Sequence, residues 1–348
     1  MRRKVCTAAA VVTAIITAGC SNGSDTPSAT SRVSPPTPAA ATTTPTPPAN
    51  RTPSLPEPSF TTTTDLVYLT VDGVELHIDV YTPASPGPWP VVVAFHGRSD
   101  QGKDSPSNTT VAAAAAAAGM MVYAPTWYSG DPFPIAIDDI DKLTDAGNCA
   151  VAYAQQHAAD HGGDAARTVT YGFSAGTGPA LASALAPSDV AIAGCNARTT
   201  PEPVAGVVLG DGEYFWQSEA FDDAFRDDLD ARQASVATFT APAAWPDDLA
   251  ATFFLGAAAD GTAPRSTGDP WDASGWLAQR DPAGSLRDDL ERLDQLGDGV
   301  ISYIDSAQLL RLRLAEAGHD VKLAITPGGH TIDDKVAQLV EWLAAAAN

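Results

Sequence analysis

Basic residues are scarce in this 348-residue chain, which carries 20 Lys+Arg against 42 Asp+Glu. The first nineteen residues hold three of the basic residues and no acidic one, so the remainder has a balance of 17 − 42 = −25. An excess of negative charge disfavours binding to nucleic acid or to bare anionic lipid, because both are polyanions. We therefore expect no nucleic-acid partner.

Long apolar runs are also absent, apart from one near the N-terminus. Residues 5–18 carry no charge and follow Met1-Arg2-Arg3-Lys4, but they are too few to span a bilayer. They end in Thr17-Ala18-Gly19-Cys20, which resembles the lipobox of bacterial lipoproteins. We predict a signal peptide over residues 1–19 and a lipid on Cys20, which would anchor the protein to the extracytoplasmic face of the cell membrane. The alternative is an ordinary cleaved signal in which Cys20 is incidental.

Cysteine is rare, and sequence patterns typical of metal sites are missing. There is no CxxC, no HExxH and no dense His/Asp cluster, so the sequence does not support a metal site. Besides Cys6 and Cys20, only Cys149 and Cys195 occur, and an even pair in an exported protein favours a disulfide. Closing a loop of 195 − 149 = 46 residues would stabilise the fold by about 4 kcal/mol. Two buried free thiols are the alternative.

The chain divides by composition into a linker and one large domain. Residues 20–60 are rich in Ser, Thr, Pro and Ala, a composition that cannot bury a core, so we predict a disordered spacer there. Residues 61–348 leave 348 − 60 = 288 residues, which suits one large domain better than two.

Strand and helix patterns alternate along this domain. The Asp72-Gly73 turn joins two alternating strands, and Val91–Phe95 is a continuous apolar run typical of strands covered on both faces. The pattern predicts an α/β fold with a doubly wound, mostly parallel sheet. The other expected strands, including the two that the turn joins, are Val67–Val71, Glu75–Tyr81, Met120–Tyr123, Thr168–Tyr171, Val204–Leu209, Phe253–Leu255 and Val321–Ile325. The expected helices are Pro106–Ala118, Ile135–His161, Ala175–Ala186 and Val336–Ala346.

A candidate nucleophile lies in Gly172-Phe173-Ser174-Ala175-Gly176, which matches the G-x-S-x-G nucleophile elbow. In a chain rich in Gly and Ala, the match alone fits a surface turn as well. A predicted strand before it and a predicted helix after it favour Ser174 as a nucleophile.

A serine hydroxyl needs an imidazole to accept its proton, and His330 follows the last predicted strand at the expected edge of the sheet. The alternative is a loop histidine with a local hydrogen bond. The usual chain order of serine, acid and histidine selects Asp260 as the carboxylate that orients the imidazole. A turn aspartate before glycine is the competing interpretation, with Asp269 and Asp272 as reserves.

Backbone N–H groups are expected to stabilise the oxyanion that forms in the reaction. One follows the nucleophile, at Ala175, and the second is predicted in the loop His96-Gly97-Arg98, at Arg98.

Over residues 65–347, these motifs resemble the α/β-hydrolase superfamily. Phe95-His96-Gly97, the run at 161–164 and the elbow are similar to carboxylesterases near the hormone-sensitive-lipase and feruloyl-esterase branches. The resemblance implies a serine esterase that acts on a small-molecule ester and needs no cofactor, and it supports the Cys149–Cys195 disulfide. A serine peptidase and a catalytically silent envelope binding protein are the alternatives. The chain departs from the family in two places. Pro179 is expected to remove a hydrogen bond from the helix after the elbow, and an insertion at about 264–300 is expected to form the roof of the site.

Overall fold

The protein is described from a computed structural model. The chain divides into Met1–Leu55 and Pro56–Asn348, and all described residues lie in the second unit. The predicted signal peptide, Cys20, Asp260 and nearly all of the predicted insertion lie outside the described residues. Those described are 59–98, 101–127, 140–185, 192–197, 200–212, 214, 245–257, 284, 288–289, 303–327 and 329–348.

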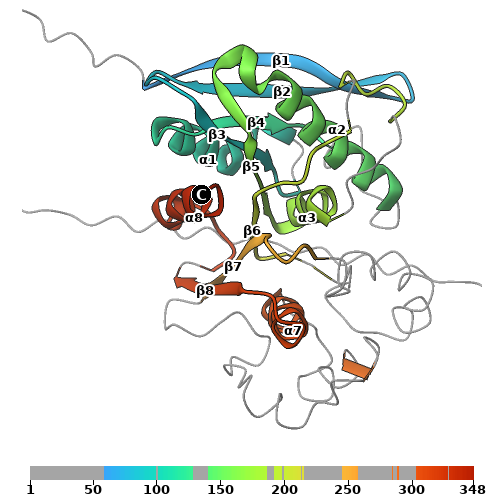
Figure 1. The fold of residues 1–348 in the computed structure, drawn as a ribbon, viewed down its shortest axis with the longest axis vertical. Helices are drawn as coiled ribbons and strands as arrows, with labels where there is room; N and C mark the ends of the chain where they lie inside the picture. The colour runs from blue at the N-terminus through green and yellow to red at the C-terminus, as the bar shows by residue number, and fades with distance from the viewer. Residues whose placement is uncertain are drawn as a thin grey trace, which may run out of the picture. The chain divides into compact units, whose positions relative to one another are not determined.

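An eight-stranded sheet forms the centre of the fold, in the order β1-β2-β4-β3-β5-β6-β7-β8 (Figure 1). Strands β3 to β8 pair in parallel, whereas β2 pairs antiparallel with both β1 and β4. The predicted mostly parallel α/β sheet is therefore confirmed. The strand bounds are β1 Phe60–Val71, β2 Val74–Pro83, β3 Trp89–Phe95, β4 Met121–Pro125, β5 Gly163–Phe173, β6 Gly206–Gly210, β7 Ala250–Ala257 and β8 Val321–Pro327.

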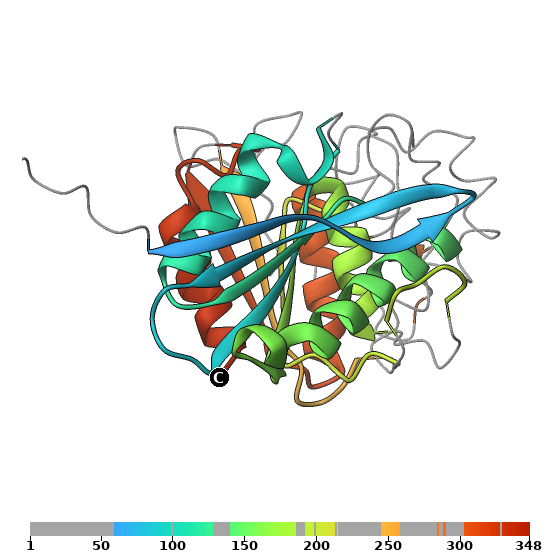
Figure 2. The same cartoon turned by 90° about the horizontal axis from the view of Figure 1, so that it is seen from above.

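Helices cover both faces of the sheet (Figure 2). The helix bounds are α1 Pro106–Ala117, α2 Ile140–Ala158, α3 Thr177–Leu185, α7 Tyr303–Glu316 and α8 Val336–Ala346. Alternate residues of β3 fall into two hydrophobic clusters, with Val91, Val93 and Phe95 facing α2, α3 and α7, and Val92 and Ala94 facing α1 and α8. This explains why β3 reads as an unbroken apolar run. None of the described helices is long and apolar enough to cross a membrane.

The first two strands form the predicted hairpin. Asp72 and Gly73 have φ of 51° and 81°, and Val71 pairs directly with Val74, so a two-residue turn with both φ values positive closes it. β1 is longer than predicted because the exposed threonines 61–64 belong to the strand. Threonine is β-branched and favours strands, but without apolar residues at alternate positions these threonines give no strand pattern in the sequence.

Helix α7 was not predicted. Its buried residues include Leu309, Leu310 and Leu314, and the arginines between them weaken the apolar pattern. One of these, Arg313, forms an ion pair with the buried Asp289, so its charge is neutralised where it meets the protein interior.

The predicted disulfide between Cys149 and Cys195 forms, with Cα atoms 5.8 Å apart. It ties α2 to residues 192–197, which lie along the edge strand β1. There the Thr70 N–H donates to the Gly194 carbonyl (2.9 Å) and the Asn196 N–H donates to the Tyr68 carbonyl (2.8 Å). The segment therefore covers part of an otherwise unpaired sheet edge.

Candidate active site

The nucleophile motif forms a sharp turn between β5 and α3. β5 ends at Phe173, and Ser174 begins a short 3-10 turn with φ of 54°. This left-handed conformation is uncommon for a residue with a side chain and marks local strain. The strand, the strained turn and the helix give Ser174 the placement expected of a nucleophile elbow.

The glycines of the motif allow close backbone contacts. A Cβ on Gly172 would overlap the Gly176 carbonyl. A Cβ on Gly176 would lie 2.6 Å from the His96 carbonyl oxygen and closer still to that of Phe95. A larger residue at Gly172 would therefore disrupt the turn itself, and one at Gly176 would prevent the turn from packing directly on the end of β3.

Pro179 does not disturb the helix after the elbow, contrary to the prediction. The α-helix begins only at Thr177, after the 3-10 turn, so Pro179 lies in its first turn. The first N–H groups of a helix have no intrahelical acceptor, and a proline there removes no hydrogen bond.

His330 lies after β8, and its ring stacks on Phe173, with ring centroids 4.8 Å apart. Phe173 directly precedes Ser174, so the tertiary structure brings His330 against the neighbour of the predicted nucleophile, although 330 − 174 = 156 positions separate His330 from Ser174 in the sequence. Both follow strands of the same parallel sheet, whose carboxyl ends meet at one edge. Of the other histidines, His77 lies in β2 and His157 in α2.

A carboxylate that the sequence did not single out contacts this histidine. Asp211 directly follows β6, is 1% exposed, and places Oδ2 3.4 Å from His330 Nδ1. Its N–H donates to the Phe254 carbonyl of β7 (3.0 Å), which fixes its backbone. The predicted acid, Asp260, and the two reserves, Asp269 and Asp272, lie outside the described residues. The signal available in the sequence was an aspartate immediately after a buried strand.

The loop after β3 lies beside the nucleophile. A Cβ on Gly97 would be 3.3 Å from Ser174 Cβ, so this loop passes within van der Waals contact of the elbow. Arg98 is exposed, and Ala175 is half-buried in the turn that begins at Ser174. The predicted oxyanion donors thus belong to the two segments that flank Ser174; their role stays a prediction.

No protein-family model and no curated protein sequence matches the chain. Solved structures do match it. A thermophilic esterase of the planctomycete Thermogutta terrifontis with propionate bound aligns with a TM-score of 0.52 at 19% identity, covering 83% of this chain and 93% of that chain. Its butyrate-bound form aligns at 0.51 and 20% identity, covering 83% and 92%. Esterase 2 of that organism phosphoramylated by tabun aligns at 0.51 and 19%, covering 83% and 93%.

The chain has the α/β-hydrolase fold. At this level of identity the likeness establishes the fold and not the activity, because one fold hosts many functions. In this α/β-hydrolase fold, Ser174 follows the fifth strand, Asp211 the sixth and His330 the eighth.

His96 and Trp127 clamp the loop after β3. His96 Nδ1 lies 2.7 Å from the Gly97 carbonyl, while Nε2 accepts the Trp127 backbone N–H at 3.4 Å. These partners require a neutral ring with its proton on Nδ1. Trp127 Nε1 also donates to the His96 carbonyl (2.9 Å). Burial lowers the pKa of His96 to about 4, although the bond to Gly97 opposes this.

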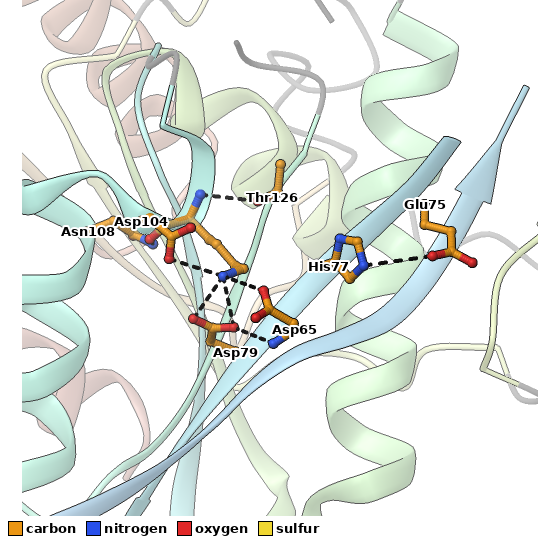
Figure 3. A network of polar contacts seen from close by, with 8 residues as sticks. Asp65, Glu75, His77, Asp79, Asp104, Asn108 and Thr126 are labelled. Atoms are coloured by element: carbon orange, nitrogen blue, oxygen red, sulfur yellow. Dashed lines mark hydrogen bonds and ion pairs between the residues drawn. The ribbon is translucent and has the colours of Figure 1, made fainter. Parts of the chain in front are cut away.

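A buried ion cluster fixes the far end of the same loop. Lys103 Nζ, 7% exposed, lies 3.0 Å from Asp65, 3.1 Å from Asp79 and 3.0 Å from Asp104. Figure 3 shows these three aspartates converging from separate parts of the chain. Burial by itself would lower the pKa of Lys103, but hydrogen bonds to the three carboxylates outweigh it and raise the pKa. The cluster ties the loop to the β1–β2 hairpin.

Acidification below pH 6.5 should destabilise the protein through His96. Its folded-state pKa of about 4 lies below the ordinary value of 6.5, so its stabilising contribution is present above pH 6.5 and is lost as the pH falls toward 4. The loss amounts to at most about 3 kcal/mol. We expect His96→Asn, which keeps a donor for the Gly97 carbonyl but cannot titrate, to lose less stability between pH 7 and 4.5 in urea unfolding.

The matched control is His77→Asn, which removes a more exposed histidine from β2. It should lose stability with acid as the wild type does. An equal acid loss in wild type and His96→Asn would contradict the assignment.

Proposed function

We propose that this protein is a serine hydrolase that cleaves carboxylic ester bonds of small molecules. One arrangement carries the proposal. His330 stacks on Phe173, the residue before Ser174 in its strained elbow, and the buried Asp211 carboxylate lies 3.4 Å from His330 Nδ1. A serine, a base and a group that orients the base are the components of nucleophilic acyl transfer.

In the proposed reaction, Ser174 Oγ attacks the ester carbonyl while His330 Nε2 accepts the hydroxyl proton. A carboxylate at Nδ1 holds the ring in the correct tautomer and stabilises the imidazolium that forms. The N–H groups of Ala175 and of Arg98 donate to the oxyanion. His330 then passes the proton to the departing alcohol, which leaves an acyl group on Ser174. Water, activated by the same histidine, releases the acid and restores the serine.

Esters are the proposed substrates because proteins of similar structure are esterases. The Thermogutta terrifontis protein is an esterase whose structures hold propionate or butyrate, and it reacts covalently with tabun. Transferred to this chain, these properties support a small acyl group on the substrate and a nucleophile reactive toward organophosphorus compounds.

Labelling with a fluorophosphonate probe tests the proposal. We expect the probe to attach to Ser174 and the wild type to hydrolyse short nitrophenyl esters, because the probe requires an activated serine. Ser174→Ala should lose labelling and at least about four orders of magnitude in kcat. Ser85→Ala is the matched control, since Ser85 is exposed and lies in the β2–β3 connection.

A folded wild type that neither labels nor hydrolyses esters would reject the hydrolase proposal and favour a binding protein. Labelling with turnover of amides instead of esters would favour a peptidase.

Replacing the two candidate acids separately identifies the one that orients His330. We propose Asp211 for this role, from its contact, while Asp260 is the prediction from chain order. Asp211→Asn should reduce kcat by about a thousand- to ten-thousand-fold, because an amide holds the wrong tautomer, and Asp260→Asn should change it less than about tenfold. The reverse result would assign the role to Asp260.

We also propose that the protein is exported and lipid-anchored through Cys20. The leader and lipobox-like residues support this, and the Cys149–Cys195 disulfide fits an oxidising compartment. In a bacterium that processes lipoproteins, the full chain should incorporate an alkyne-labelled fatty acid and sediment with membranes. Cys20→Ala should lose both properties and Cys6→Ala should retain them. Membrane retention of Cys20→Ala without labelling would count against the anchor.

A further inference from the structure

Lys335 is fully buried beside the candidate active site. It directly precedes α8, and its side chain is 0% exposed. Its Nζ donates to the backbone carbonyls of Gly329 and Thr331, the two residues that flank His330. One ammonium group therefore joins both sides of the histidine's own loop.

The same ammonium also faces the carboxylate that contacts the histidine. Asp211 Oδ2 lies 3.9 Å from Lys335 Nζ and 3.4 Å from His330 Nδ1. A single carboxylate oxygen thus lies near the Lys335 ammonium on one side and the His330 imidazole on the other. Lys335 is thus linked to His330 in two ways: through the carbonyls of the two residues beside it and through Asp211.

Keeping a lysine in this position is energetically costly. Burial lowers the pKa of Lys335, and the negative charges of Asp211 and Asp334 act against that shift. An apolar residue of the same length would avoid the desolvation cost, but it would leave two carbonyls and a buried carboxylate without this donor. Two tyrosines, Tyr171 and Tyr214, also lie near Asp211, and burial followed by its charge raises the pKa of each.

We propose that Lys335 is a positioning residue for His330, holding the loop on both sides of the imidazole and balancing the charge of Asp211. This inference rests on the proposed hydrolase function. Lys335 does not touch the reacting atoms in this scheme; it sets the place and the protonation equilibrium of the base. The elbow motif and the serine–acid–histidine order do not include such a residue.

Steady-state kinetics across pH tests the inference in Lys335→Met and Lys335→Gln. With Lys335→Met, kcat should fall about ten- to a hundred-fold while KM changes less than about threefold, because substrate contacts remain and the base is displaced. The pKa that governs the acid limb of kcat/KM should rise, because the imidazolium no longer feels the ammonium. Lys335→Gln keeps a neutral N–H donor group, so it should retain more kcat but show the same direction of pKa change.

Two comparisons separate positioning from general stability. Lys322→Met makes the same change at an exposed residue of β8 and should leave kcat, KM and the pH profile unchanged. Lys335→Met combined with Asp211→Asn should lose little more activity than Asp211→Asn alone, because the two residues act on one histidine.

The outcomes distinguish this inference from the proposed function. A wild type without labelling or turnover defeats the hydrolase proposal. An active wild type with unchanged kcat and pH profile in Lys335→Met overturns only the role of Lys335. A rise in KM alone, or the failure of both variants to fold by circular dichroism, also overturns it, since Lys335 would then serve binding or the fold.

Discussion

The contact between the nucleophile turn and the end of β3 constrains the whole site. Gly176 packs against the Phe95 and His96 carbonyls so tightly that no side chain fits between them. Beside this contact Ser174 adopts its left-handed conformation, and the Gly97 loop passes within van der Waals contact of it. Because β3 and β5 pair in parallel, both segments leave the sheet at the same edge. The serine and its predicted oxyanion loop are thus placed side by side through this backbone contact.

Two buried lysines hold loops that carry site residues, in a chain with a large excess of acidic residues. Lys103 anchors the loop after β3 to three aspartates, and Lys335 binds the loop after β8 beside Asp211. An unpaired buried ammonium would be costly, so each must keep its partners in place. The loops that carry site residues are held by charge and hydrogen bonds, while the sheet beneath them is held by apolar packing. His96, which burial keeps neutral, also holds the loop after β3 through its hydrogen bonds to Gly97 and Trp127.

Most of the framework could be predicted from local sequence patterns. Strand and helix alternation led to the observed sheet, α8 has the predicted bounds, and Cys149 and Cys195 form the expected disulfide. Predictions failed where a residue's setting depends on distant segments. Helix α7 was missed because Arg313 interrupts its apolar pattern and is neutralised by Asp289, outside the helix. Pro179 was misjudged because the preceding 3-10 turn, packed on β3, delays the start of α3.

The sequence by itself determined the α/β alternation, the elbow with Ser174 and the presence of His330 after the last strand, because these depend on short-range spacing and residue type. Only the tertiary structure decided which residues of the described part surround that histidine. A carboxylate from any of several parallel strands can point toward the same edge, and chain order does not say how far each side chain lies from the imidazole. Asp211 contacts His330 from the end of β6, and Lys335, at the start of α8, binds the carbonyls on both sides of His330, an arrangement that depends on how the sheet twists and how the helix packs on it.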